Sequence, residues 1–212
     1  MNYIKFSYIY PPRPKNAIQS SDLDFWENND NMIAQCKLNG SNCSIYTNGD
    51  IYVVMNRHGQ RLTNFKLSES EIKSLYKGTG GWMLLNGEYL NKSKKDENNK
   101  IFNHKFIIFD ILINDGDYLV GKTFENRINI LDNLYGKTDS EKPYLYSISE
   151  NVYRVKSYTS GFNKIYDEVT KVDMMEGIVM KKKCAKLESS GSSDNNSRGQ
   201  VKVRKKTKNY AY

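Results

Sequence analysis

The stretch AQCKLNGSNCSIYTNGDIYVVMNRHG, residues 34–59, places a lysine where an apolar strand ends and a tight turn begins. Residues 32–36 are largely apolar, as in a buried strand, and Lys37 follows them directly. A strand that needed only solubility could carry lysine at any exposed position. A lysine just before the turn residues Asn39 and Gly40 therefore indicates a side chain that is held in place for a purpose.

Apolar segments of strand-like pattern recur along the whole chain and predict a protein rich in β-structure. Asn48-Gly49 between two such segments predicts a two-residue hairpin. The predicted strands are residues 33–37, 42–47, 50–56, 81–90, 105–113, 151–157, 176–182 and 200–206. Helical spacing and capping residues predict helices at residues 68–78, 122–136 and 160–172.

Many strands combined with a few helices predict an α+β fold of two packed, mainly antiparallel sheets flanked by helices. The polar stretch at residues 91–100 is too hydrophilic to pack, which predicts an exposed loop. The Ser-, Asn- and Gly-rich stretch at residues 184–200 predicts a mobile loop.

The composition is that of a basic protein without membrane or secretory features. The 212 residues carry a net charge of +8 with a pI near 9.2, which favours a nucleic acid or a nucleotide as partner. No apolar run is long enough to span a bilayer, so we expect an intracellular protein that does not enter a membrane. The three cysteines form no CxxC pair, which argues against a disulfide framework or a zinc site.

Charged residues recur at or near the ends of the predicted strands. Any one of them is what solubility requires, but together they describe a cleft of alternating cations and carboxylates. Such a cleft suits a nucleoside triphosphate with its magnesium ion. The residues are Lys37, Arg57, Glu88, Asp110, Glu176, Lys181, Lys202 and Arg204.

Six short motifs in this order resemble those of the covalent nucleotidyltransferase superfamily, which comprises ATP-dependent DNA ligases, RNA ligases and mRNA-capping guanylyltransferases. KLNG, NRHG, LNGEYL, FIIFDIL, EGIVMK and VKVRKK are similar to motifs I, Ia, III, IIIa, IV and V. The resemblance extends from about residue 34 to the end of the chain. It implies that residues 1–212 form one nucleotidyltransferase, or adenylation, domain.

The resemblance implies that Lys37 is the catalytic nucleophile. It would attack the α-phosphate of ATP, release pyrophosphate and keep AMP as a phosphoramidate. The implied cofactors are ATP and Mg²⁺ or Mn²⁺, since a divalent ion offsets charge on the phosphates.

The same resemblance implies nucleotide-binding roles for eight further residues. Glu88 and Glu176 would hold the metal or the ribose, and Lys181 and Lys202 would grip the α-phosphate. Phe109 would stack on the base, although a core aromatic is an equally good interpretation of that position. The full set is Asn42, Arg57, Glu88, Phe109, Glu176, Lys181, Lys202 and Arg204.

The motifs favour an RNA ligase and leave other members of the superfamily open. The run KLNGSN, with Asn42 five places after Lys37, looks like the KxHGTN pattern of RNA ligase 2-like enzymes. The segment after motif IIIa looks like that of DNA ligases, and residues 201–212 resemble motif V of some viral ligases. A capping guanylyltransferase and a non-catalytic nucleic-acid-binding module are the less favoured alternatives.

The implied partner is a nicked or 5′-phosphorylated nucleic acid strand. The sequence stops after motif V, so it holds no counterpart of the usual C-terminal OB-fold domain. The sequence leaves three alternatives open: a longer protein cut at the domain boundary, a naturally minimal enzyme, or a partner domain or subunit that supplies that part. The Asn-, Lys-, Ile- and Tyr-rich composition fits an AT-rich genome and suggests a viral origin.

Overall fold

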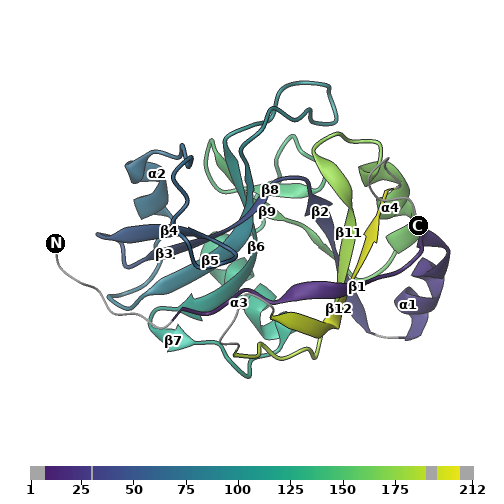
Figure 1. Cartoon of the computed structure of the whole chain (residues 1–212), viewed down its shortest axis with the longest axis horizontal. Helices are drawn as coiled ribbons and strands as arrows, with labels where there is room; N and C mark the ends of the chain where they lie inside the picture. The colour runs from purple at the N-terminus through teal and green to yellow at the C-terminus, as the bar shows by residue number, and fades with distance from the viewer. Residues whose placement is uncertain (1–7, 30, 190–194, 206–212) are drawn as a thin grey trace.

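A computed structural model describes residues 8–29, 31–189 and 195–205 and contains two mixed, mostly antiparallel sheets (Figure 1). The α+β fold class expected from the sequence is therefore confirmed. Two strand pairs are parallel, β1 with β12 and β6 with β9, whereas the other pairs are antiparallel.

The first sheet has the strand order β1-β12-β11-β2-β10. Its strands are β1 (Arg13–Ala17), β2 (Met32–Leu38), β10 (Ser157–Tyr158), β11 (Met175–Lys182) and β12 (Asn196–Arg204). The second sheet has the order β4-β3-β5-β6-β9-β8, with β7 paired to β6. Its strands are β3 (Ser41–Thr47), β4 (Tyr52–Asn56), β5 (Met83–Leu90), β6 (Lys105–Asn114), β7 (Asp117–Tyr118), β8 (Leu145–Ser147) and β9 (Val152–Val155).

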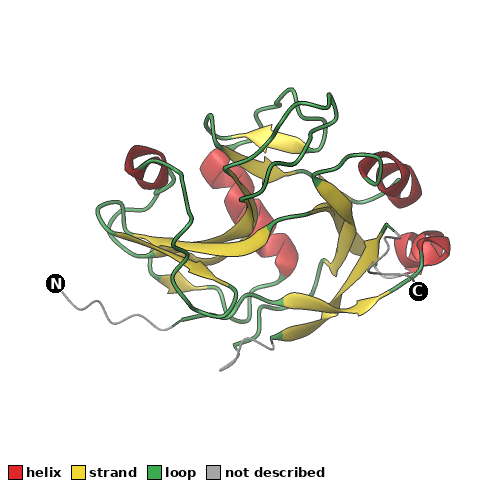
Figure 2. Cartoon of the chain, turned by 45° about the horizontal axis from the view of Figure 1, so that its top comes forward, coloured by secondary structure: helices red, strands yellow, loops and turns green. Residues whose placement is uncertain are grey.

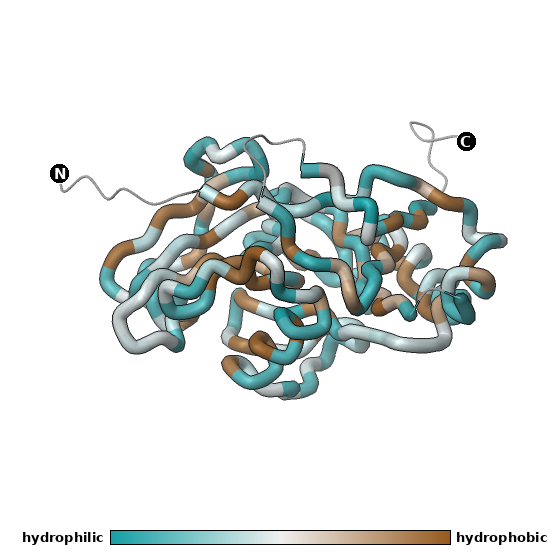
Figure 3. Tube along the Cα trace, turned by 90° about the horizontal axis from the view of Figure 1, so that it is seen from below, coloured by the Kyte–Doolittle hydropathy of each residue, from teal (hydrophilic) through white to brown (hydrophobic). Residues whose placement is uncertain are grey.

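The helices lie against the sheets (Figure 2), and the buried apolar side chains form two clusters. Their bounds are η1 (Ser20–Asp22), α1 (Leu23–Asn29), α2 (Glu69–Ser74), α3 (Phe124–Tyr135) and α4 (Phe162–Val169). Helices α2 and α3 pack on the second sheet, and α1 and α4 pack on the first. Apolar segments follow the packed strands, while the connecting loops are largely hydrophilic (Figure 3). Within the described ranges, no helix has the length and apolar character that crossing a bilayer requires.

The backbone passes from the first sheet to the second between Leu38 and Ser41. Gly40 lies so close to β5 that a Cβ atom there would come within 2.5 Å of the carbonyl oxygen of Tyr89. Glycine is therefore required for the close approach of the two strands. Lys37 occupies the second-last position of β2 and lies at this crossing, as its place before the turn predicted.

Two local predictions about turns and helix ends need correction. The β3–β4 connection contains four residues, because Thr47 pairs with Tyr52. The Asn48 side chain accepts hydrogen bonds from the backbone of Asp50 and Ile51, and this longer turn replaces the predicted two-residue hairpin. Helix α2 has the predicted capping box at Ser68 but ends at Ser74, four residues before Gly78.

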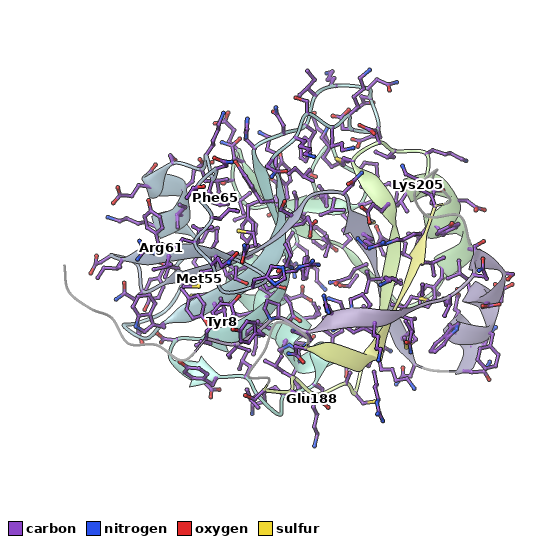
Figure 4. All side chains as sticks on the ribbon, in the orientation of Figure 1. Tyr8, Met55, Arg61, Phe65, Glu188 and Lys205 are labelled. Atoms are coloured by element: carbon purple, nitrogen blue, oxygen red, sulfur yellow. The ribbon has the colours of Figure 1, made fainter. Side chains whose placement is uncertain are left out.

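The elements at the N-terminal end were missed by the sequence analysis. Strand β1 and helix α1 precede the first predicted strand, and β1 pairs with β12 from the far end of the chain. Tyr8, labelled in Figure 4, donates a hydrogen bond to the carbonyl oxygen of Asn56 and so fastens this segment to the second sheet. At the end of β12, Lys205 donates to the carbonyl oxygens of Thr170 and Val172 beyond α4 (Figure 4).

The polar stretch at residues 91–100 is not simply an exposed loop. Asp96 is buried and accepts hydrogen bonds from the backbone of Asn98 and Lys100. Lys142 Nζ lies 2.6 Å from Asp96 Oδ2, so the charge is buried together with its partner. Hydrophilic residues pack here because the opposite charges of Asp96 and Lys142 neutralise each other, which the composition of the loop alone did not indicate.

The stretch predicted as a mobile loop, residues 184–200, is partly ordered strand. Asn196–Gln200 already belong to β12, which begins four residues earlier than the sequence indicated. Leu187 is buried and forms a bridge with Val120. Residues 190–194 lie outside the described part of the chain.

A buried ion pair joins α3 to the centre of β6. Arg127 Nε donates to Asp110 Oδ1 at 2.8 Å, and its Nη2 donates to Oδ2 at 3.0 Å. Both side chains are 2% exposed. Asp110 therefore lies in the core, and its expected place among the charges of the cleft is wrong. The carboxylate of Asp110, in the middle of β6, instead binds Arg127 of α3, the helix that packs on this sheet.

We expect Arg127→Met to destabilise the fold by about 3–5 kcal/mol, because it leaves the buried Asp110 carboxylate without its partner. Urea unfolding followed by circular dichroism measures this loss. The double variant Asp110→Leu with Arg127→Met should recover most of it, since no buried charge then remains unpaired. A loss below about 1 kcal/mol for the single variant would refute the proposed role of the pair.

Candidate active site

Two adjoining cavities lie where the sheets face each other. The wide cavity has a volume of about 780 Å³, and the narrow cavity has a volume of about 130 Å³. Their walls share residues from both sheets and from the N-terminal strand: Arg13, Pro14, Lys37, Asn42 and Glu88. The wide cavity is lined mainly by charged and polar groups, whereas aromatic and aliphatic groups contribute to the narrow one.

Lys37 reaches the wide cavity beside Glu176 on the neighbouring strand. Its Nζ donates to Glu176 Oε2 at 2.5 Å, and Arg204 Nε lies 3.5 Å from the same oxygen. Gly177 pairs with both Lys37 and Arg204, so the three residues form one row across the first sheet.

Strand β11 has a bulge at Glu176, directly before the row that contains Gly177. The pairing register shifts between Met175 and Gly177, and Gly177 has φ +143°, which favours glycine. A Cβ atom at Gly177 would overlap the carbonyl oxygen of Val203. The bulge places the Glu176 carboxylate on the same side of the sheet as the lysine amine.

Glu88 approaches from the second sheet and contacts the crossing itself. Its Oε1 accepts a hydrogen bond from the backbone N–H of Gly40 at 3.1 Å. Burial raises the pKa of Glu88 to about 7, and the positive charge of Lys37 opposes that shift. Asn42 pairs with Glu88 across β3 and β5 and so lies directly beside it.

Asn39, the first residue after β2, connects the wall of the wide cavity to the loop at residues 91–100. With its amide oriented to satisfy both neighbours, Asn39 donates to Glu176 Oε1 at 3.2 Å and accepts from Lys94 Nζ at 3.1 Å. Asn39 N–H also donates to the carbonyl oxygen of Met174. These contacts fix the turn that follows Lys37.

The narrow cavity combines an aromatic wall with two buried polar groups. Lys181 Nζ lies 4.9 Å from the ring centroid of Phe109 and 4.4 Å from that of Phe124. Burial lowers the pKa of Lys181 to about 8. Gln35 Nε2 donates to Phe109 O, while Gln35 Oε1 is buried without a hydrogen-bond partner in the described residues. A buried acceptor of this kind is costly unless a ligand satisfies it.

Lys202 lies between the wide cavity and strand β1. Its Nζ donates to the carbonyl oxygens of Pro14 at 3.1 Å and of Lys15 at 3.5 Å. Burial lowers the pKa of Lys202, and the positive charges of Arg204, Lys37 and Arg13 act in the same direction. The lysine is thus part of a dense cluster of cations.

The structure brings all nine predicted site residues to the walls of these two cavities. Most line the wide cavity: Lys37, Asn42, Arg57, Glu88, Glu176, Lys202 and Arg204. Phe109 and Lys181 line the narrow cavity instead. Lys181 pairs with Ile33, four residues along β2 from Lys37, so it lies nearer the aromatic wall than the row that contains Glu176.

Several lining residues were missed by the sequence analysis, among them Arg13, Lys15, His58 and Gln35. Arg13 and Lys15 belong to the unpredicted strand β1, and the run PPRPK at residues 11–15 was their only signal. His58 accepts a hydrogen bond from Arg57 Nε at 3.0 Å, and Gln35 appeared to be an ordinary strand residue.

The protein groups alone do not form a metal cage. Among the residues that the structure places, no cluster of three or more His, Cys, Asp or Glu could hold an ion. Glu176 lies close enough to Glu88 for its negative charge to contribute to the raised pKa of Glu88, after burial. Two carboxylates suit Mg²⁺ only when phosphate oxygens and water complete its octahedral shell.

Comparison with known proteins gives one family match and several similar folds. A family model described as RNA ligase matches residues 30–203. A search of curated proteins found no match.

Among solved structures, a mycobacterial DNA ligase D complexed with ATP and MES is similar, with a TM-score of 0.66 at 13% identity over 94% of this chain and 62% of that chain. The ligase domain of LigD from M. tuberculosis gives a TM-score of 0.62 at 12% identity, over 94% of this chain and 61% of that one. A structure of a Lig E DNA ligase gives a TM-score of 0.54 at 18% identity, over 91% of this chain and 68% of that one. The chain thus spans about three fifths of the first two structures, and the likeness shows a shared fold.

We expect Lys181→Met to stabilise the fold at pH 7 by about 1–3 kcal/mol, raising the melting temperature by at least a few degrees. The pKa of Lys181 is about 8 in the fold and near 10.5 when unfolded, so at pH 7 the charged amine carries the full cost of burial. That cost falls as pH rises through 8, so the gain should shrink towards pH 10. Thermal melts across this pH range measure it, with the exposed Lys164→Met as control. A gain that does not change with pH would contradict this account.

Proposed function

The chain belongs to the RNA ligase family, and from this premise we propose that it is the nucleotidyltransferase domain of an ATP-dependent polynucleotide ligase. Lys37 is its nucleophile and forms a covalent lysyl-AMP. The observation that carries the proposal is the position of this amine. It lies 2.5 Å from a carboxylate, in a cavity lined by further cations.

The proposed reaction begins with attack of the neutral Lys37 amine on the α-phosphorus of ATP. An N–P bond forms, the bond from the α-phosphorus to the bridging oxygen breaks, and pyrophosphate leaves with that electron pair. Glu176 Oε2 is within reach to accept the proton that the amine loses. Arg204 lies in the row that holds Lys37, and Lys202 lies two residues before it on β12; both stabilise the charge that develops on the α-phosphate.

The groups that line the narrow cavity favour adenine as the base of the nucleotide. Phe109 offers an aromatic face on which a base can stack. The buried acceptor Gln35 Oε1 suits the exocyclic amino group of adenine, and Lys181 offers a donor for a ring nitrogen. Guanine presents an oxygen in place of that amino group, so the pair of groups favours ATP over GTP.

Mg²⁺ or Mn²⁺ fits the same scheme as a partner of the phosphates. Glu88 and Glu176 are the carboxylates that would hold it, together with phosphate oxygens. When bound, the ion would neutralise charge on the phosphates and on the leaving group. Asn42 and Arg57 lie on the wall that carries Glu88, where the ribose hydroxyls need polar partners.

The polynucleotide is proposed to be RNA with a 5′-phosphate, to which AMP is transferred before sealing. The family match and Asn42 five places after Lys37, as in the KxHGTN pattern of RNA ligase 2-like enzymes, support RNA. The net charge of +8 supports a polyanionic partner of either kind. Further contacts with the nucleic acid would come from another domain or subunit.

We expect wild-type protein incubated with ATP and Mg²⁺ to gain one adenylyl group, a mass increase of about 329 Da. Intact-mass spectrometry detects it, and Lys37→Ala should abolish it. Lys164→Ala, a lysine exposed on α4, is the matched control and should label normally. Adenylylation that persists in Lys37→Ala, or labelling by GTP alone, would overturn the proposal.

We expect the protein to seal a nicked duplex faster when the 3′-hydroxyl strand ends in RNA than when it ends in DNA, by about tenfold or more. Gel-based sealing assays on otherwise identical nicks measure the ratio. A preference for DNA ends would assign the chain to DNA ligation. Salt-sensitive binding without sealing or labelling would instead identify a non-catalytic nucleic-acid-binding module.

A further inference from the structure

The two oxygens of the Glu176 carboxylate have different partners. Oε2 faces Lys37 Nζ at 2.5 Å and Arg204 Nε at 3.5 Å, whereas Oε1 accepts a hydrogen bond from the side-chain amide of Asn39 at 3.2 Å. A carboxylate turns easily about its last side-chain torsion, so a hydrogen bond to one oxygen decides where the other points. The contact with Asn39 therefore keeps Oε2 directed at the amine of Lys37.

The orientation of the Asn39 amide is decided by a lysine that belongs to none of the sequence motifs. An amide has one donor end and one acceptor end. An ionised carboxylate can only accept and an ammonium can only donate, so the amide nitrogen faces Glu176 and the amide oxygen accepts from Lys94 Nζ at 3.1 Å. Both hydrogen bonds have a charged partner, which makes them stronger than neutral ones. A chain of contacts thus runs from Lys94 through Asn39 and the carboxylate to the proposed nucleophile.

Lys94 is itself held in place, in the loop between β5 and β6 at the top of Figure 1. Its Nζ lies 3.8 Å from Asp173 Oδ1, and its side chain is only 24% exposed. The next residue, Lys95, donates its N–H to Asp173 Oδ2 at 3.0 Å and accepts from Met174 N–H at 3.0 Å. Residues 173–174 lead directly into β11, so the loop and Glu176 are fastened to the same short segment.

We propose that Lys94 is a positioning residue for adenylylation, which acts through Asn39 to hold Glu176 Oε2 where it accepts the proton that the Lys37 amine loses. The inference rests on the proposed function and adds a residue from outside its motifs. The walls that the described residues form around the two cavities do not include Lys94. Its effect is therefore on the orientation of the carboxylate and not on the nucleotide directly. Small errors in the placement of a reacting group are costly, which gives this indirect contact its importance.

The rate of lysyl-AMP formation, measured without nucleic acid in single-turnover experiments over a range of ATP concentrations, tests this role. At saturating ATP and Mg²⁺, we expect Lys94→Met to lower the rate about 3- to 30-fold, because the carboxylate is no longer held in one orientation. The half-saturating concentration of ATP should stay within about twofold, since Lys94 does not line the cavities. A higher half-saturating concentration with an unchanged rate would show that Lys94 binds the nucleotide and would overturn the assignment.

A double-mutant cycle tests whether Lys94 acts through Asn39. Alanine fits the backbone at residue 39, because Asn39 does not have a positive φ. We expect Asn39→Ala to slow lysyl-AMP formation about tenfold or more. Adding Lys94→Met to that variant should slow it by less than about twofold further, because the connection is already lost. If the two effects multiply instead, Lys94 acts by another route and the inference is wrong.

Three controls separate positioning from folding and from general charge. Lys94→Arg keeps a cationic donor and should react within about threefold of the wild-type rate. Lys92→Met removes an exposed positive charge from the same loop and should leave the rate unchanged. Equal slowing by Lys92→Met would assign the effect to general charge. Melting temperatures complete the set: a lower melting temperature for Lys94→Met with an unchanged rate would show that the contact only fastens the loop.

The Asn39 amide also provides a readout that needs no reaction. In NMR spectra of the isotope-labelled full chain without nucleotide, its side-chain NH₂ signals are those missing from Asn39→Ala. We expect them to shift in Lys94→Met and in Glu176→Gln but not in Lys92→Met. If the wild-type protein takes no label while these signals respond, the proposed ligase chemistry fails and the chain of contacts stands. If the wild-type protein is labelled but the signals ignore Lys94→Met, the chain of contacts fails and the proposed function stands.

Discussion

The crossing of the backbone from β2 to β3 is the constraint on which this site depends. Only Asn39 and Gly40 separate the two strands, and they belong to different sheets. Gly40 touches the backbone of β5, and its N–H holds the carboxylate of Glu88. Because one short turn ties both sheets together, Lys37 from the first and Glu88 from the second face the same cavity.

The site concentrates groups that burial disfavours. Burial lowers the pKa of Lys181 to about 8 and raises the pKa of Glu88 to about 7, so each charged form is costly in the fold. The surrounding structure compensates through the apolar clusters that pack on both sheets. Perturbed groups gathered in a cleft are typical of functional sites, which agrees with the placement of the motif residues.

The two cavities differ in the way that the parts of a nucleotide differ. The narrow one has an aromatic wall and buried polar groups with exact hydrogen-bonding needs, as a flat base requires. The wide one has six cations and two carboxylates, which is the charge pattern that the proposed binding of phosphates and a divalent ion calls for. Strand β1 borders both, so the N-terminal segment completes a site whose other walls come from the motifs.

The sequence by itself determined the α+β class and most strand positions, and its motifs selected nine residues that all line the two cavities, because alternation of apolar residues and short motifs are local signals. It could not show that Asp110 turns into the core to meet Arg127, or that Asp96 is buried against Lys142, since both partners are distant in the chain. Nor could it show strand β1, which is mostly exposed and polar and is fixed by pairing with β12. Only the tertiary structure decided which charges share a cavity, because an ion pair or a parallel strand pair depends on segments that only folding brings together.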